Sequence, residues 1–145
     1  MFILPASVSL SEKETDALKK YVESGGVLIS DYGAGIYDGH GKKVNNKQLL
    51  EIFGIEREEE NEIVFGGAGI KIKETQVEGL RNRDVQLRFG EKGLKLKKGK
   101  AYGETGDSKA PAIIINKFGK GKAILLNCVI NDYSQVTLIG GGEVS

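Results

Sequence analysis

One glycine-rich loop holds the side chains that are best placed to bind a ligand. It spans residues 30–41 and carries Asp31, Tyr32, Asp38 and His40. The loop directly follows an apolar run, and open α/β sheets bind their ligands beyond the carboxyl ends of their strands. We therefore predict a ligand-binding loop at these four residues. The alternative is that each side chain only stabilises a turn, as Asp and Gly in loops commonly do.

Nucleophilic catalysis has no support in this loop. A nucleophile elbow needs serine or cysteine between glycines, as in G-x-S-x-G, in a tight turn after a strand. The turn here reads Asp31-Tyr32-Gly33-Ala34-Gly35, and His40 is the only histidine of the chain. Cys128 follows an apolar run, which is typical of a packed thiol. We therefore expect no catalytic residue in the chain. The alternative is a hydrolase that uses Asp38 and His40 for acid and base catalysis.

Metal and cofactor sites are also not expected. Asp31, Asp38 and His40 could converge on a divalent ion, but their spacing matches no known metal motif. The run Gly66-Gly67-Ala68-Gly69 lies between two strand-like segments and opens no helix, so it fails the context of a dinucleotide-binding loop. It is interpreted as a hairpin turn. We predict no metal and no cofactor.

Composition places the chain among globular proteins of one domain. It has 145 residues, of which 39% are apolar, and a formal net charge of +1. A single cysteine cannot form an internal disulfide, and the N-terminal apolar run is too short for a leader or a membrane span. We therefore expect a cytoplasmic location and no membrane partner.

Residues 81–122 are locally basic, with twelve basic and four acidic residues. This segment has few aromatic residues, so we expect its charges to lie on a solvated strand face and we expect no nucleic-acid partner.

Residues 1–60 predict a strand, a helix, a strand and a second helix. Phe2-Ile3-Leu4 is a short strand, and Ser11 with Glu14 forms a capping box for a helix that runs to about Ser24. A buried strand, Val27-Leu28-Ile29, follows Gly25-Gly26. Such a unit is a parallel crossover, which predicts an α/β fold with an open sheet.

Caps and apolar positions predict the extent of the two helices. The first helix presents Ala17, Leu18, Tyr21 and Val22 on one face. The second helix has Asn45 or Asn46 as its cap and Gly54 as its end. The segment from Glu56 to Glu62 is interpreted as its exposed acidic continuation.

Residues 61–128 predict a β-rich portion with antiparallel hairpins. The clearest hairpin pairs residues 112–116 with residues 122–127 through a loop at residues 117–121. Two parallel strands and one helix cannot bury both faces of a sheet. We therefore expect either that later elements cover the second face or that a longer polypeptide or a partner subunit does, and we favour the latter.

Several stretches of the chain resemble one known family. The resemblance lies in Leu4-Pro5-Ala6, Leu10 to Glu14, the run from Leu18 to Ile29, the loop from Asp31 to Gly41, Leu50 to Ile55, Asn116 to Asn127, and Asp132-Tyr133. Together they resemble the class I glutamine-amidotransferase-like domain of β-galactosidases, which is called the trimerisation domain in glycoside hydrolase family 42.

The resemblance implies a flavodoxin-like sheet with a partial amidotransferase-like fold. It implies that residues 1–145 form one such domain, truncated at both ends relative to the family pattern. Gly33 stands close to where an amidotransferase would carry its nucleophile, so glutamine hydrolysis is not expected. The implied function is a noncatalytic assembly domain of a β-galactosidase, whose partners are further copies of itself or a catalytic barrel domain, and which lines a sugar site with Asp31 to His40. The alternative is a free-standing hydrolase or a sugar-binding module that uses this loop.

Overall fold

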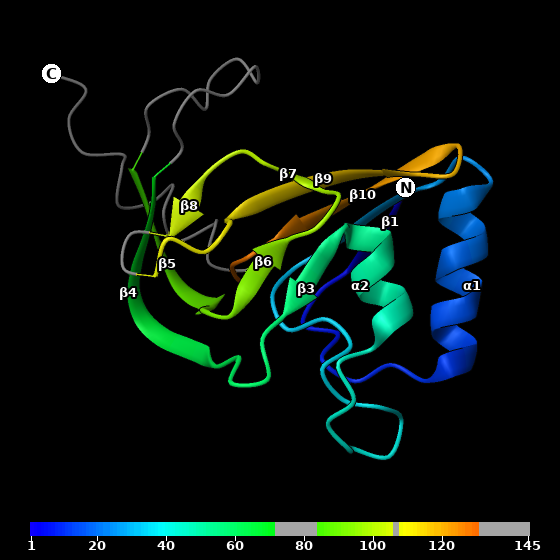
Figure 1. Ribbon diagram of the computed structural model, residues 1–145, viewed down its shortest axis with the longest axis horizontal. Helices are drawn as coiled ribbons and strands as arrows, with labels where there is room; N and C mark the ends of the chain where they lie inside the picture. Colours follow the sequence, from blue (N-terminus) through cyan, green and yellow to red (C-terminus); the bar gives the residue numbers. More distant parts are fainter. Residues whose placement is uncertain (72–83, 106–107, 131–145) are drawn as a thin grey trace, which may run out of the picture.

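A strand, a helix and a parallel second strand open the fold, as the sequence predicts (Figure 1). The computed structural model describes residues 1–71, 84–105 and 108–130. Strand β1 (Phe2–Leu4) pairs in parallel with β2 (Val27–Ser30), and α1 (Glu12–Glu23) connects them. The crossover predicted from residues 1–30 is therefore confirmed.

Helix α1 begins with the predicted capping box. The Ser11 hydroxyl accepts from the Glu14 N–H, and the Glu14 carboxylate accepts from the Ser11 N–H at 2.8 Å. The buried face differs slightly from the predicted one, because Ala17 is exposed and Thr15 is buried instead. Thr15 is buried as a polar residue because its hydroxyl donates to the Ser11 carbonyl and accepts from the Asn46 amide.

The central sheet has five strands in the order β1-β2-β10-β9-β7. Strand β10 (Gly121–Leu126) is parallel to β2, and β9 (Ile113–Phe118) and the short edge strand β7 (Lys100–Ala101) continue the sheet in antiparallel fashion. The predicted β9–β10 hairpin is confirmed, but its loop is shorter than predicted. Phe118 and Gly121 are paired, so only Gly119 and Lys120 form the turn, and Gly119 takes the left-handed conformation that this turn needs.

Helix α2 (Lys47–Phe53) begins at Asn46, whose side chain accepts from the Leu49 N–H at 3.1 Å. It ends at Gly54, which has φ of +67°. The chain then turns directly into β3 (Ile55–Arg57), which pairs with β6 (Leu94–Leu96). The acidic segment is therefore not an exposed continuation of the helix, because it starts as a strand and because Asn61 is buried within it.

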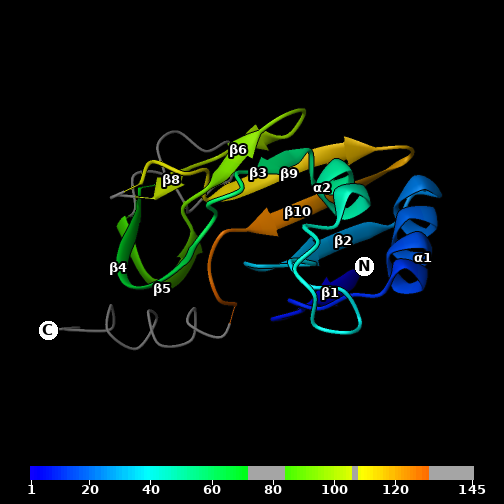
Figure 2. The same cartoon turned by 60° about the horizontal axis from the view of Figure 1, so that its bottom comes forward.

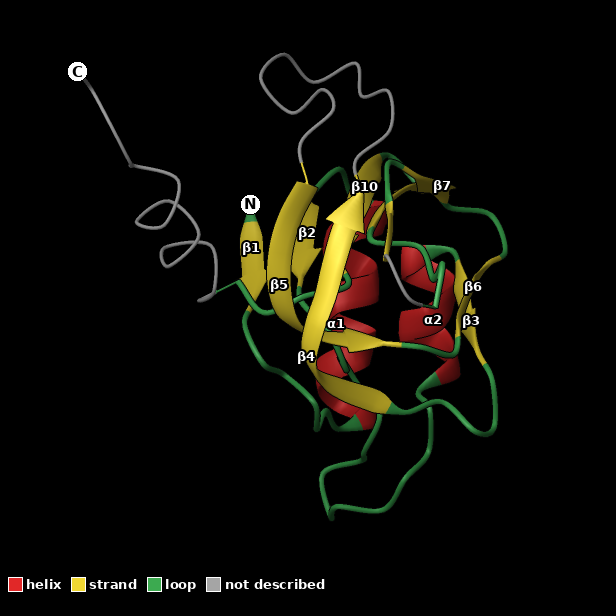
Figure 3. Ribbon diagram, turned by 90° about the vertical axis from the view of Figure 1, so that its left-hand side faces the viewer, coloured by secondary structure: helices red, strands yellow, loops and turns green. Residues whose placement is uncertain are grey.

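A second, three-stranded sheet has the order β5-β4-β8. Its long strands β4 (Ile63–Lys71) and β5 (Asp84–Glu91) run side by side in Figure 3, and β8 (Glu104–Thr105) pairs with β4. The expected hairpin turn at Gly66–Gly69 is wrong: these glycines lie inside β4, where the pairing register shifts between Phe65 and Ala68. Glycine tolerates such an irregularity in a strand, so a cluster of glycines is not a reliable turn signal.

Helices α1 and α2 lie against one face of the five-stranded sheet and contact each other (Figure 2). The core on this side includes Val22 of α1, Phe53 of α2, and Leu28, Ile114 and Leu125 of the sheet. Residues of the opposite face alternate with these and are only half-buried: Val27, Ile29, Ile113, Ile115, Ile124 and Leu126. Among the described residues, one face of the sheet is thus closed by helices and the other remains partly open.

Candidate functional site

Asp31 lies at the carboxyl end of β2 and is buried, with 1% of its surface exposed. Its carboxylate accepts from the Ala6 N–H at 2.7 Å and from the Ile130 N–H at 3.5 Å. Burial raises the pKa of Asp31, and these two hydrogen bonds partly oppose that shift. The side chain therefore ties the segments that follow β1 and β10 to the end of β2.

Tyr32 is half-buried, and its N–H donates to the Cys128 carbonyl at 3.3 Å. Cys128 itself is buried, with 8% exposed, as expected for a packed thiol. This contact joins the turn after β2 to the segment after β10. Asp31 and Tyr32 thus both act at the junction of neighbouring strand ends.

Asp38 and His40 lie further along the loop, at its surface. The Asp38 carboxylate accepts from the N–H groups of His40 and Lys42, each at 2.9 Å, and the Ser9 hydroxyl donates to the Asp38 carbonyl. These hydrogen bonds to Asp38, chiefly from Lys42 and then from His40, lower the pKa of its carboxyl group. Asp38 is therefore a turn-stabilising carboxylate that stays ionised near neutral pH.

A surface groove of about 810 Å³ contains Asp38 and His40. It lies between the starts of the two helices, where Ser11 and Asp16 of the α1 region and Asn46 line it. Asp31 and Tyr32 are not among its lining residues. The structure thus brings two of the four predicted site residues together and places the other two apart from them.

The turn after β2 has a left-handed residue, as a nucleophile elbow does, but that residue is Gly33 and not serine or cysteine. Gly33 has φ of +72°, a left-handed conformation that glycine adopts without strain. A nucleophile elbow continues into a helix, whereas here the chain continues as a loop until α2. The Gly33 N–H points at the protein's own Glu91 carboxylate, at 2.7 Å.

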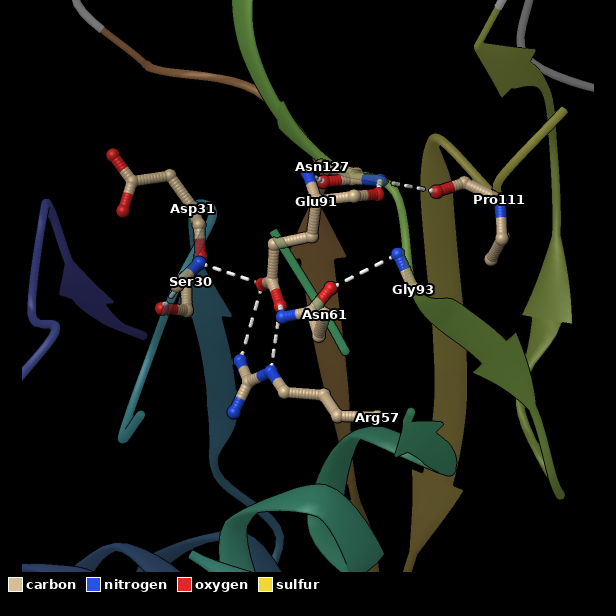
Figure 4. A network of polar contacts seen from close by, with 9 residues as sticks. Ser30, Asp31, Arg57, Asn61, Glu91, Gly93, Pro111 and Asn127 are labelled. Atoms are coloured by element: carbon tan, nitrogen blue, oxygen red, sulfur yellow. Dashed lines mark hydrogen bonds and ion pairs between the residues drawn. The ribbon is translucent and has the colours of Figure 1, made fainter. Parts of the chain in front are cut away.

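Glu91 belongs to a buried polar cluster that the sequence did not reveal (Figure 4). Its carboxylate pairs with Arg57, with Nε to Oε2 at 2.6 Å and Nη2 to Oε1 at 3.1 Å. The side chains of Arg57 and Glu91 are 1% and 0% exposed. Such a bidentate pair in a low-dielectric interior fixes the relative position of its two strands, here β3 and β5.

Two asparagines complete the cluster. The Asn61 amide donates to Glu91 Oε2 at 2.7 Å and its oxygen accepts from the Gly93 N–H at 2.9 Å. Asn127 accepts from the Glu91 N–H at 2.6 Å and donates to the carbonyls of Glu91 and Pro111 at 2.9 and 3.0 Å. The cluster therefore links the turn after β2, the β3–β4 connection, the β5–β6 turn and the end of β10.

One sequence signal could have located this cluster. Arg57 is the only basic residue between Glu56 and Glu62, and it follows the apolar Ile55 by two positions, which is the spacing of one strand face. The surrounding acids hid this signal, because a charged run usually indicates a solvated surface.

The described part of the chain contains neither a cluster of metal-ligating side chains nor a membrane-spanning helix. Within residues 1–71, 84–105 and 108–130, no three histidine, cysteine or acidic side chains are grouped so that they could hold a metal ion. None of the described helices is long and apolar enough to cross a membrane.

Together, the fold and the site define an α/β domain with a mixed sheet, in which the turn after β2 carries glycine at position 33. The chain belongs to the β-galactosidase trimerisation domain family, whose model matches residues 1–141. The resemblance seen in the sequence is confirmed by this match. Within that family the chain is a noncatalytic assembly domain of the glycoside hydrolase type.

Solved structures with the same fold include two β-galactosidases. Gan42B, a GH42 β-galactosidase from G. stearothermophilus, is 23% identical with a TM-score of 0.73 over 95% of this chain and 20% of its own. The enzyme from Bacillus circulans sp. alkalophilus is 18% identical with a TM-score of 0.76 over 94% of this chain and 21% of its own. The chain thus spans about a fifth of the length of these enzymes.

A smaller protein also has this fold. Cytoplasmic Protein STM1381 from Salmonella typhimurium LT2 is 17% identical, with a TM-score of 0.63 over 83% of this chain and 54% of its own. A search among curated proteins found no match.

Proposed function

We propose that this domain holds together the subunits of a β-galactosidase of the GH42 type, as a trimer. The observation that carries the proposal is the family match over residues 1–141. In the same proposal, residues 1–145 are one domain of a longer cytoplasmic polypeptide whose catalytic carboxylates lie in a separate barrel domain. The length of the two β-galactosidases, about five times the part that this chain matches, supports that arrangement.

The half-open face of the sheet supports an assembly role. Ile3, Ile29, Ile124 and Ile115 are register partners on four neighbouring strands, so they form one row on this face. Ile3 is 47% exposed and the other three are half-buried. Contiguous apolar surface of this kind is typical of protein interaction sites, because covering it removes apolar area from water.

The test is the native mass of the purified chain, measured by light scattering after size exclusion over a concentration series. A particle with three times the chain mass of 15.7 kDa, stable on dilution, is expected. Ile3→Lys should weaken this particle, while Val44→Lys, which replaces an apolar side chain of similar exposure (40%) in the loop before α2, should not. A stable monomer of the unmodified chain would contradict the assembly role, and a stable dimer would contradict the trimer.

Carbohydrate binding by the loop is a second candidate function. It is supported by the groove that Asp38 and His40 share, because a sugar is held by such polar side chains in a depression of the surface. We expect galactose to shift the NMR signals of residues 38–40, and Asp38→Ala or His40→Ala to abolish the shifts. Asp31→Asn serves as the control, since Asp31 lies outside the groove.

The same samples test the hydrolase alternative. Release of a chromogenic group from an aryl galactoside by this chain alone, lost in Asp38→Asn, would favour a free-standing hydrolase. Absence of galactose binding and of turnover would leave the loop with the role of stabilising a turn.

A further inference from the structure

The carboxylate of Glu91 occupies a complete set of hydrogen-bond donors. Oε1 accepts from the Gly33 N–H at 2.7 Å and from Arg57 Nη2 at 3.1 Å. Oε2 accepts from Arg57 Nε at 2.6 Å and from Asn61 Nδ2 at 2.7 Å. Each oxygen thus receives two donors, and Arg57, Asn61, Gly33 and Glu91 are all removed from solvent or nearly so. Four donors around one carboxylate form a binding site for that group.

The elements that carry the donors are positioned by contacts that do not involve the Glu91 side chain. Gly33 lies in a turn that the Gly33 carbonyl stabilises by accepting from the Ile36 N–H. Arg57 belongs to β3 and is paired there with Leu94, and Asn61 is held by hydrogen bonds to Glu58 and Gly93. The surrounding structure therefore positions the Gly33 N–H and the Asn61 amide, and it places the backbone of Arg57, whose guanidinium then completes the set of donors by bonding Glu91.

One nitrogen of Arg57 lies outside this set of donors, on the side of the guanidinium away from Glu91 (Figure 4). Nη1 of Arg57 is buried and makes no hydrogen bond within the described residues. An unpaired buried guanidinium nitrogen is costly, because its lost hydration is not replaced. The protein keeps this buried guanidinium despite that cost, with its other two nitrogens both bonded to the Glu91 carboxylate.

We propose that the turn after β2 is a carboxylate-binding site that the chain's own Glu91 occupies. Its ligand class is a small monocarboxylate, and the site accepts a free one when the Glu91 carboxylate is removed. In the unmodified protein the elbow is closed to an external carboxylate or amide ligand and serves as a joint between β2, β3 and β5. This inference does not depend on the trimer.

Glu91→Ala with acetate tests the site. The substitution removes one methylene and the carboxylate, and acetate supplies a carboxylate on one carbon to the space that is left. We expect a lower melting temperature for Glu91→Ala, and a recovery of about 5 °C when acetate is present at roughly twenty times its dissociation constant. Chloride at equal ionic strength and acetamide should give no comparable recovery, because neither presents two anionic oxygens.

Two variants control for effects elsewhere in the protein. Glu58→Ala removes an exposed carboxylate that pairs with Lys95, so it creates no buried space. Glu91→Gln leaves the site filled by an uncharged group of the same shape. Neither variant should gain stability from acetate beyond the gain from chloride.

The proposal fails if acetate stabilises Glu91→Ala no more than chloride does, or if Glu58→Ala or Glu91→Gln gains as much as Glu91→Ala. If Glu91→Ala is unfolded in plain buffer, the yield of refolded protein in acetate and in chloride is compared instead. Acetate-dependent refolding supports the site, and equal or absent refolding in the two salts overturns it.

Discussion

Gly33 lies in the turn after β2, where a nucleophile elbow would carry its serine or cysteine. Its left-handed backbone is retained, yet its N–H is used by Glu91 and it has no side chain to act as a nucleophile. A Cβ atom at this position would lie 3.2 Å from Val8 Cγ1. The residue is therefore required by both its conformation and its packing.

Gly33→Ala is expected to destabilise the protein more than Gly41→Ala does. Gly41 has φ of +80° and an added Cβ would meet nothing within 4 Å, so that substitution costs only the left-handed strain, about 1 kcal/mol. Gly33→Ala adds the contact with Val8, for a total of roughly 2 kcal/mol. Urea unfolding of both variants measures the difference, and equal losses would show that the packing at Gly33 is loose.

The pH dependence of stability is expected to report the hydrogen bonds of Asp38. They lower the pKa of Asp38 in the folded state below its value of about 4 in the unfolded chain. The stabilisation is therefore complete above pH 4 and is lost as the pH falls through the folded-state pKa. The wild type should exceed Asp38→Asn in melting temperature at pH 6, and this advantage should shrink toward pH 3. A constant difference over that range would show that ionisation of Asp38 does not matter.

At the residue level, sequence reasoning located the loop but not the direction of its side chains. The strand-end rule correctly placed Asp31 beyond β2, yet the carboxylate turns inward to backbone N–H groups. Which way a side chain points depends on strands that lie far away in the sequence. Arg57 was missed for the same reason, since its partner Glu91 is 34 residues away.

Helices were predicted better than strands because their signals are local. The capping box at Ser11 and the terminal Gly54 lie within one turn of the helix that each delimits. Strand pairing is set by distant segments, so the sequence could not show that β10 inserts between β2 and β9. The glycines of β4 were misread because a bulge and a turn favour the same residue.

One side chain of β9 hydrogen-bonds the end of helix α2, in addition to the apolar packing of the helix on the sheet. Asn116 is buried and its amide donates to the carbonyls of Ile52 at 2.9 Å and Glu51 at 3.3 Å. Both carbonyls belong to the last turn of α2, where the Glu51 carbonyl also accepts from the Gly54 N–H at 3.1 Å, and for the Ile52 carbonyl Asn116 supplies the donor. Asn116 therefore connects the end of the helix to the sheet.

Asn116→Ala is expected to cost about 1.5 kcal/mol, because the buried Ile52 carbonyl loses its donor while the Glu51 carbonyl keeps the Gly54 N–H. Asn116→Asp should cost more, since a carboxylate would face the same carbonyls and would repel them. Chemical denaturation at pH 7 measures both losses. An Asp variant as stable as the Ala variant would show that water replaces the amide at this site.

At the scale of the whole molecule, the cluster around Glu91 joins two sheets that share no strand. The five-stranded sheet contributes the end of β10, and the three-stranded sheet contributes the end of β5. Gly90 allows this approach, because a Cβ there would lie 3.1 Å from the Asn127 carbonyl. Cooperative unfolding of the two sheets thus depends on a few buried polar contacts.

Asn127→Ala is expected to uncouple the two sheets. The variant loses the hydrogen bonds of Asn127 to both backbone groups of Glu91 and to Pro111, and it leaves these groups buried, at a cost of about 3 kcal/mol. Since domain stability is commonly about 5–15 kcal/mol, the loss should open the β4–β5 hairpin without unfolding the sheet of β1, β2, β9 and β10.

Native-state hydrogen exchange measures this uncoupling. In Asn127→Ala the amides of β4 and β5 should exchange at a lower free energy than those of β9 and β10, whereas in the wild type the two groups should exchange together. Asn116→Ala is the matched control. It also removes a buried asparagine, but the side-chain hydrogen bonds of Asn116 go to α2 and not to the cluster around Glu91. It should lower stability in both groups equally. If the amides of β4 and β5 still exchange together with those of β9 and β10 in Asn127→Ala, contacts other than this cluster hold the two sheets together.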